Sequence, residues 1–226
     1  MICLIRVSRL RRISNYIIAG SAILFITNCS SARYSSEFKT HKKQLDTLSY
    51  FDPIVRIMFN DFKTQYIDTV IGQQIKMQIG EIATSILSSK YILEKQEIPE
   101  IEPELLDDLY CKFDNSKGQL NGIPCATILK DIPIAFKHRF VLLITFNSKI
   151  NPDYGPHHNI ARGMATNSII FASHTKPSSK VRLLVLDTKL QEVVYYDLLT
   201  STNYDPRIRS EVEHIIRNIL RGMYYK

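Results

Sequence analysis

Residues 139–146 read Arg-Phe-Val-Leu-Leu-Ile-Thr-Phe and form the most apolar stretch of the chain beyond its N-terminal region. A continuous apolar run of this length is typical of a strand that is buried on both faces of a sheet. Such a strand needs a layer of helices or further sheet on each face. The stretch therefore predicts a central strand in a layered domain that contains both helices and strands.

Further strand patterns follow this stretch. Val181–Leu186 and Glu192–Leu199 are rich in Val, Leu and Tyr, and Asp187-Thr188-Lys189-Leu190 joins them. Two such runs around a short polar turn predict a β-hairpin. A short strand is also expected at Ser168–Ala172.

Three amphipathic helices are expected. From Ile67 to Leu87, apolar residues recur at steps of three and four. A second helix should open near Pro103, and the residues that would share one of its faces are Leu105, Leu106, Leu109, Tyr110 and Phe113. For the closing helix, Asp205 is the expected N-cap, Pro206 the first helical residue and Gly222 the residue just past the end.

The remaining strand patterns are Ile54–Phe59 and Tyr91–Leu93. The expected order is then β-α-β-α-β-β-β-β-α. We predict the fold class α/β (α+β), with a mixed β-sheet flanked by helices in a single domain that covers residues 50–226.

The N-terminus has the pattern of a secretory signal peptide, predicted to cover residues 1–28. A basic segment comes first and contains Arg6, Arg9, Arg11 and Arg12. The apolar stretch Tyr16–Ile26 follows, and it is too short to span a bilayer, which needs about 20 apolar residues. We therefore expect this chain to be exported.

The segment Ile26-Thr27-Asn28-Cys29 resembles a lipobox, the site at which lipoproteins receive a diacylglycerol on a cysteine. The resemblance implies that Cys29 is lipidated and becomes the first mature residue. Asn28 departs from the pattern, in which a small residue precedes the cysteine. Two alternatives remain open, namely cleavage by the ordinary signal peptidase after Ala32 or an uncleaved short anchor.

Residues 29–49 are predicted to be the lipidated Cys29 and a flexible tether, because this stretch is polar and shows no apolar period. Removal of the signal peptide would leave 25 Lys and Arg against 22 Asp and Glu, a net charge of +3. A domain this close to neutral lacks the basic footprint of a nucleic-acid-binding protein. We expect a membrane partner through the lipid, and no nucleic acid.

Two cysteines remain after export and lipidation, Cys111 and Cys125. In an oxidising compartment they would form a disulfide across a loop rich in turn formers. The alternative is two unpaired thiols. No Cys/His spacing typical of a zinc site occurs, and we expect neither a metal nor a cofactor.

The sequence predicts no enzyme. It contains no Gly-x-Ser-x-Gly, His-Glu-x-x-His or P-loop pattern. The alternative is a periplasmic metal-dependent hydrolase built on His157 and His158, since imidazole binds transition metals. Neighbouring side chains of an extended segment point to opposite faces, however, so these two histidines do not easily share an ion.

The connection Asn147–Asn167 is the longest stretch without apolar periodicity inside the expected domain. Long loops of this kind are commonly functional. We hypothesise that its tip contacts a partner protein through Tyr154, His157, His158 and Arg162, with Tyr154 as the aromatic anchor.

Several of these features together resemble the envelope lipoproteins typified by the curli-secretion channel CsgG and the penicillin-binding-protein activator LpoB. The features are the lipobox, the first strand with its long helix, the stretch 139–146, the hairpin and the closing helix. The resemblance implies a non-catalytic binding or assembly factor, whose partner is another envelope protein or a second copy. Ser30 after the cysteine suits anchoring in the outer membrane, facing the periplasm.

Overall fold

The structure is a computed structural model, and it describes residues 32–41, 45–60, 65–97, 103–115, 120, 124, 138–150, 177–202 and 204–224. Ala32–Lys226 form one compact unit. The predicted signal peptide and Cys29 lie outside the described residues. No helix in the described ranges is both long enough and apolar enough to cross a membrane.

The described part of the unit contains one mixed sheet of eight strands, which confirms the predicted fold class. The strands are β1 (Arg33–Tyr34), β2 (Thr47–Phe51), β3 (Ile54–Asn60), β4 (Gln65–Ile67), β5 (Ile92–Gln96), β6 (Phe140–Ile150), β7 (Ser178–Asp187) and β8 (Glu192–Ser201). Their order is β1-β8-β7-β6-β2-β5, and β3 pairs with β6 and β4. Strands β2, β3 and β6 are parallel, whereas β6, β7, β8 and β1 are antiparallel neighbours.

Strand β6 is the central strand that the apolar stretch predicted. One of its edges pairs with β7 from Phe140 to Lys149, and the other edge pairs with β2 and then with β3. The strand runs on to Ile150. Asn147–Ile150 are therefore strand residues, which corrects the expectation that the loop begins at Asn147. The rest of that loop, from residue 151 on, and the expected strand Ser168–Ala172 lie outside the described residues.

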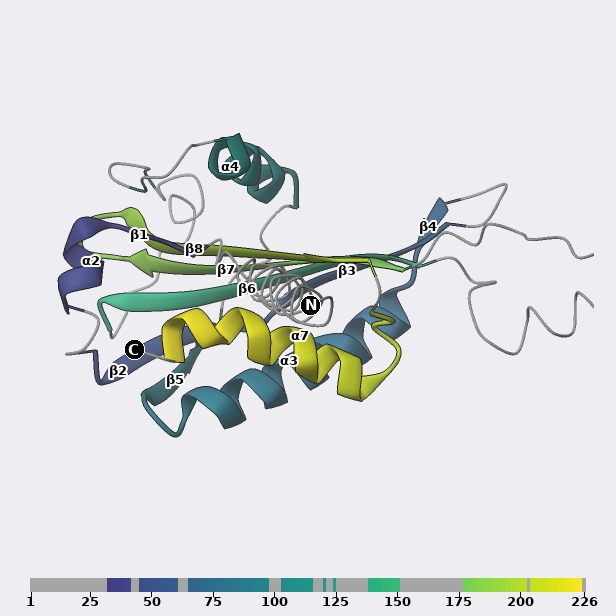
Figure 1. Ribbon diagram of the computed structural model, residues 1–226, viewed down its shortest axis with the longest axis horizontal. Helices are drawn as coiled ribbons and strands as arrows, with labels where there is room; N and C mark the ends of the chain where they lie inside the picture. Colours follow the sequence, from purple (N-terminus) through teal and green to yellow (C-terminus); the bar gives the residue numbers. More distant parts are fainter. Residues whose placement is uncertain are drawn as a thin grey trace, which may run out of the picture. The chain divides into compact units, whose positions relative to one another are not determined.

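Helices cover both faces of the sheet (Figure 1). The described helices are α2 (Ser36–His41), α3 (Thr69–Leu87), α4 (Pro103–Asn115) and α7 (Arg209–Tyr224). Helices α3 and α7 pack on one face, which we call the helical face, and α4 packs on the opposite face, which we call the α4 face.

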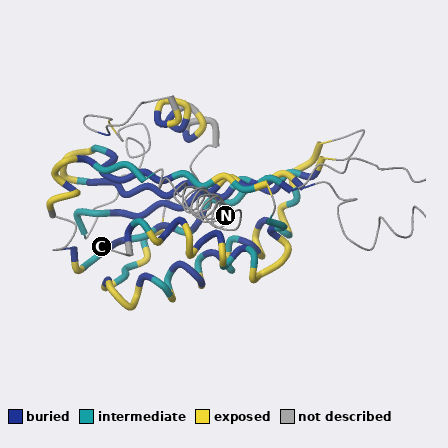
Figure 2. The backbone as a smooth tube through the Cα atoms, viewed as in Figure 1, coloured by how far each residue is buried: buried dark blue, intermediate teal, exposed yellow. Residues whose placement is uncertain are grey.

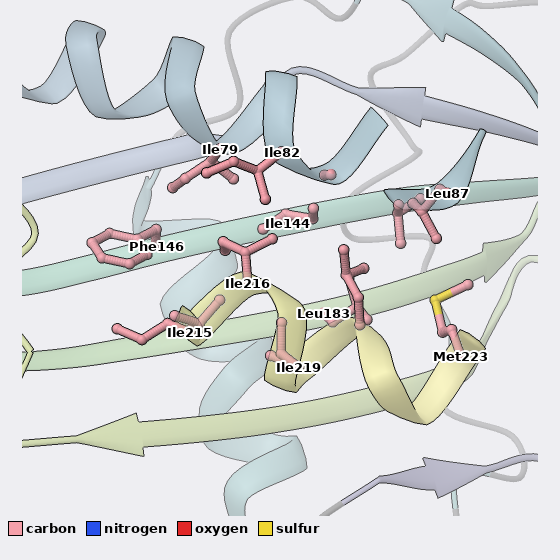
Figure 3. Close-up of a cluster of buried hydrophobic side chains, with 14 of the residues drawn as sticks. Ile79, Ile82, Leu87, Ile144, Phe146, Leu183, Ile215, Ile216, Ile219 and Met223 are labelled. Carbon is pink, nitrogen blue, oxygen red and sulfur yellow. The ribbon is translucent and has the colours of Figure 1, made fainter. Parts of the chain in front are cut away.

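The helical face holds the larger apolar core. Figure 2 shows buried residues along α3, α7 and the strands of the sheet. The side chains of this core come from α3, α7 and the inward positions of β3, β6 and β7 (Figure 3). Among them are Ile79, Ile82, Ile144, Phe146, Leu183, Ile215, Ile216 and Ile219. Most apolar residues of the two periodic patterns meet here, from Ile75 to Leu87 and from Val212 to Leu220. Ile67 and Val70, at the start of the first pattern, are exposed instead.

The smaller core lies under α4. Leu106, Leu109, Tyr110 and Phe113 pack against Val141, Leu143, Leu184 and Tyr196 of the sheet. The ring of Phe113 stacks on that of Tyr196 at 4.9 Å between centroids. Four of the five residues predicted to share a face of this helix thus do so, and the side chain of Leu105 is not among those described.

The predicted tether is wrong for the described residues 32–41 and 45–49, because they fold into the domain. Strand β1 pairs with β8, α2 follows, and β2 begins at Thr47. Phe38 and Leu45 are buried, and Phe38 packs edge-to-face on Phe140. The compact unit accordingly starts at Ala32 and not at residue 50.

The start of α3 also differs from the prediction. Ile67 belongs to β4, and the helix begins at Thr69 after the N-cap Asp68. Asp68 Oδ1 accepts a hydrogen bond of 2.9 Å from the amide of Ile71. An aspartate at this position satisfies an amide that the first helical turn leaves without a partner.

The closing helix, α7, buries the apolar residues expected to face the core, but both of its ends differ from the prediction. Asp205 accepts a hydrogen bond from the amide of Arg207 and so caps a turn before the helix, which begins at Arg209. Gly222 lies inside α7 and not past its end. The reason for a glycine here is close packing, since a Cβ atom at Gly222 would lie 2.5 Å from the hydroxyl of Tyr195.

Candidate functional site

The α4 face has two unlike halves. Helix α4 covers one half, and no described helix packs on the half that lies toward the ends of β3 and β6 and the start of β7. We call this second half the open half-face. The described residues that alternate onto it are Arg56, Met58, Ile67, Asn147, Lys149, Ser178, Lys180 and Thr200.

Burial distinguishes the two sides of these same strands. On β6, Ser148 and Ile150 are buried on the helical face, whereas Asn147 is half-buried and Lys149 is exposed on the other side. Lys180 of β7 and Thr200 of β8 are likewise exposed. A strand buried on both faces would show no such alternation, so this end of the sheet has one side open among the described residues.

Three basic side chains lie together on the open half-face. Arg56 pairs in register with Asn147, and Asn147 with Lys180. Because neighbouring strands lie about 4.8 Å apart, Arg56 and Lys180 are separated by roughly 10 Å across the sheet. Lys149 lies two residues beyond Asn147 on the same side. The arrangement is a compact group of three cations.

These three cations have no carboxylate partner in the described part of the chain, and no described Asp or Glu alternates onto the open half-face. Described cations that do form ion pairs include Arg139, Arg182, Arg207, Arg209 and Arg217. The open half-face therefore offers hydrogen-bond donors and positive charge, which is the chemistry that binds anions.

A polar cluster marks the border between the two halves. Asp114 of α4 accepts a hydrogen bond of 2.9 Å from Arg182 Nη2 and one of 2.6 Å from the hydroxyl of Tyr196. The guanidinium of Arg182 also lies over the ring of Tyr110, at 4.3 Å from its centroid. Tyr110 in turn donates a hydrogen bond to Thr145. These contacts fix the C-terminal part of α4 to the sheet.

The charge state of Asp114 follows from these contacts. Partial burial raises its pKa, but the hydrogen bonds from Tyr196 and Arg182 bring it below its ordinary value. The nearby charge of Lys180 lowers the pKa further. Asp114 is thus ionised at neutral pH, but its oxygens already accept hydrogen bonds from Arg182 and Tyr196, so Lys180 gains no ion pair of its own.

A second charged cluster closes the opposite end of the sheet. Arg139 donates to the buried Asp187 at 2.8 Å and to Glu37 of α2 at 2.9 Å. Asp187 also accepts from the amides of Lys189 and Leu190, which confirms it as a turn former of the hairpin. Every group here has a structural partner, so the cluster holds α2 and the hairpin together.

Most site residues predicted from the sequence lie outside the described residues. This holds for Cys29 and Cys125 and for the loop residues Tyr154, His157, His158 and Arg162. Cys111 is described as an exposed free cysteine on α4. Its predicted bridge to Cys125 stays a prediction. The described residues contain no group of three side chains that could hold a metal ion.

No family model and no curated protein matches this chain. Among solved structures, the PelC dodecamer from Paraburkholderia phytofirmans matches at 14% identity and a TM-score of 0.38, over 81% of this chain and 90% of that one. The lipoprotein GNA1162 from Neisseria meningitidis matches at 8% identity and 0.29, over 70% and 80%. The C-terminal domain of LpoB from Salmonella enterica matches at 8% and 0.30, over 75% and 96%. The predicted resemblance is thus confirmed as a distant likeness of fold, and it bears on the fold alone.

Proposed function

We propose that this chain is a non-catalytic binding or assembly factor of the bacterial cell envelope, anchored to the outer membrane through a lipid on Cys29 and facing the periplasm. The observation that carries the binding role is the open half-face, with Arg56, Lys149 and Lys180 lacking partners among the described residues. Unpaired cations on a sheet surface contribute little to folding, because exposed charges add at most about 1 kcal/mol. They favour the binding of an anionic partner.

The anchor rests on the order of the N-terminal segments. A basic segment, a short apolar stretch and Cys29 follow one another as in lipoprotein precursors. Two or more acyl chains hold a protein stably at a membrane, whereas one chain does so only marginally. A lipidated Cys29 would keep the domain at the envelope membrane permanently.

Replacement of Cys29 tests the anchor. In the Cys29→Ala variant, labelling with a radioactive fatty acid should disappear and the protein should move from the membrane fraction to the soluble fraction. Density-gradient separation of the two membranes should place the wild-type protein in the outer membrane. Unchanged labelling of the variant would overturn the anchor, and wild-type protein in the inner membrane would overturn the proposed location.

Photo-crosslinking tests the binding surface in intact envelopes. A photoreactive amino acid at Thr200, which lies on the open half-face, should give an adduct. The same probe at Gln73, which is exposed on α3, should give none. The Thr200 adduct should disappear when Arg56, Lys149 and Lys180 are all changed to Gln. Equal adducts at both positions would mean that the open half-face is not the binding surface.

A second contact is proposed for the loop beyond β6. Replacement of Tyr154–His158 by a Gly-Ser linker should leave the thermal midpoint nearly unchanged and remove crosslinks between a probe at Arg162 and a partner protein or a second copy. Unfolding of the domain after this replacement would assign the loop a packing role. Persistence of the crosslinks would place that contact elsewhere.

A further inference from the structure

Residues 32–41, which we call the N-terminal segment, bind to parts of the fold that lie far along the chain. Strand β1 pairs with β8 (Figure 1), and the amide of Ser35 donates a hydrogen bond of 2.9 Å to the carbonyl of Val194. In α2, Phe38 is buried and its ring packs edge-to-face on that of Phe140. The segment is therefore held by the sheet and not by its own short elements.

The two residues of β1 contact helices on opposite faces of the sheet. Arg33 Nη1 donates a hydrogen bond of 2.6 Å to the carbonyl of Phe113 in α4. The hydroxyl of Tyr34 donates one of 2.9 Å to the carbonyl of Gly222 in α7. These two partners lie 80 and 188 residues further along the chain. The segment thus reaches its bound position only after almost the whole domain has folded.

The N-terminal segment has little tendency to fold alone. Strand β1 has two residues and α2 has six. Isolated helices shorter than about 12 residues are marginal in water, and an isolated short strand has no partner for its backbone. The N-terminal part of a chain is synthesised first, whereas α7 comes last. During export the segment is therefore unfolded, and it docks as the final element.

Docking changes the free length of chain beside the proposed lipid. When the segment is docked, Ala32 packs against α7, since its Cβ lies 3.6 Å from the position of a Cβ atom at Gly222. Ala32 is three positions past Cys29, which is a span of at most about 11 Å. When the segment is undocked, residues 30–46 are free up to the start of β2, and they span up to roughly 60 Å.

Removal of a signal peptide needs the longer span. The bond between Asn28 and Cys29 follows the apolar stretch of the signal peptide and so lies next to the bilayer. Each headgroup layer is about 5–7 Å thick, and the catalytic groups of an enzyme must come within about 3.5 Å of the bond. A folded unit of nearly 200 residues has a radius of gyration of about 16 Å. A span of about 11 Å leaves no room for headgroups and enzyme beside such a unit.

We propose that the bond between Asn28 and Cys29 is hydrolysed before the N-terminal segment docks, so that docking completes the maturation of the lipoprotein. In this reaction one water molecule adds across the amide, Asn28 leaves with a carboxylate and Cys29 keeps an ammonium group. Docking then holds the lipidated Cys29 within about 11 Å of Ala32. This inference rests on the lipidation of Cys29 proposed above.

Release from an inhibitor separates folding from cleavage. In cells treated with a reversible inhibitor of the lipoprotein signal peptidase, the full chain should accumulate as a precursor that folds and docks its N-terminal segment. After the inhibitor is removed, this pool should lose its signal peptide at least about tenfold more slowly than newly synthesised precursor in untreated cells, because burial of Phe38 alone favours the docked segment by about that factor. Gel mobility over time measures both rates. Equal rates would overturn the proposed order.

A longer linker should remove this delay. A Gly-Ser insertion of about 15 residues between Ser31 and Ala32 adds up to roughly 50 Å of free chain and leaves the folded residues unchanged. The accumulated precursor of this variant should be cleaved as fast as new precursor. The control carries the same insertion after Lys226 and should keep the delay. A delay of equal size in both variants would overturn the proposal, because the short span would then not be its cause.

Weaker docking should also shorten the delay, without a longer linker. Phe38→Ala removes the buried ring of α2, so the accumulated precursor should be cleaved faster than the parent. Trypsin should cut after Lys39 sooner in this variant while the rest of the domain stays resistant, which distinguishes undocking from unfolding. Met77→Ala, on the exposed side of α3, is the control and should keep the delay. An undocked segment with the parent's delay would contradict the proposal. If the whole Phe38→Ala domain unfolds, the linker insertion decides alone.

The proposed anchor and the proposed order fail in different observations. If the inhibitor accumulates no precursor and the wild-type chain takes up no fatty acid, the anchor is wrong and the order falls with it. If a labelled precursor accumulates and is cleaved as fast as new precursor, Cys29 is lipidated and only the order is wrong.

Discussion

The two faces of the sheet differ in what their residues contribute. On the helical face, α3 and α7 bring aliphatic side chains onto the inward positions of β3, β6 and β7, and the layer is closed. On the α4 face, one helix covers half of the strands, and cations without described carboxylate partners occupy the rest. The helical face therefore holds the larger part of the described apolar core, whereas the open half-face presents charged and polar side chains among the described residues.

Truncation of a core side chain on the helical face should have the largest effect. Phe146→Ala removes a fully buried ring from the centre of the core (Figure 3). We expect a loss of about 3–5 kcal/mol in the free energy of unfolding, measured by urea denaturation. Met77→Ala is the control, because Met77 is 61% exposed on α3 and should change stability by less than about 0.5 kcal/mol. Similar losses in both variants would mean that burial does not decide stability here.

Gly222→Ala should have the next largest effect. The added methyl group would lie 2.5 Å from the hydroxyl of Tyr195. Overpacking of this kind costs about 1–3 kcal/mol, again measured by urea denaturation. Tyr195→Phe removes that hydroxyl, so the double variant should lose clearly less stability than the two single losses added together. If the two single losses simply added in the double variant, the contact with the Tyr195 hydroxyl would not be the cause of the destabilisation.

Removal of one hydrogen bond from the polar cluster under α4 should lower the free energy of unfolding by a smaller amount. Tyr196→Phe removes the 2.6 Å hydrogen bond to Asp114 and should cost about 1–2 kcal/mol. The control Tyr204→Phe concerns a half-buried tyrosine remote from this cluster and should cost less. A change of the same size in both variants would argue against a specific role for the hydrogen bond.

The pH dependence of stability tests the same cluster. The pKa of Asp114 is lower in the folded protein than its ordinary value, so the ionised carboxylate stabilises the folded state above that value. This stabilisation is lost as the pH falls through the folded-state pKa, below about pH 4. In Asp114→Asn, stability should fall less steeply than in the wild type between about pH 4 and pH 2. If the stability of both proteins fell equally steeply with pH, Asp114 would not contribute to the pH dependence of stability.

The sequence was sufficient to predict the elements and buried residues of the helical face and of the centre of the α4 face. Long periodic patterns such as those of α3, α7 and the hairpin report burial directly, because one stripe of each element meets the core. The segment 32–49 gave no such pattern. Its elements are two to six residues long and depend on single tertiary contacts, such as Phe38 on Phe140 and Tyr34 on Tyr195.

The sequence pattern of the open half-face could be recognised only once the fold was known. Asn147 and Lys149 alternate with Phe146, Ser148 and Ile150, which is the period of a strand with one open side. Polar residues in this stretch suggested a loop. Recognition of a strand here required the ten-position pairing of β6 with β7 and the finding that α4 stops short of this end.

The most direct test measures stability and photo-crosslinking at Thr200 for the chain in which Arg56, Lys149 and Lys180 are changed to Gln. The free energy of unfolding should stay within about 0.5 kcal/mol of the parent value, because these side chains have no described partner to lose. The adduct at Thr200 in intact envelopes should disappear. A marked loss of stability, or an adduct that persists at the parent level, would contradict the proposed binding role of the open half-face.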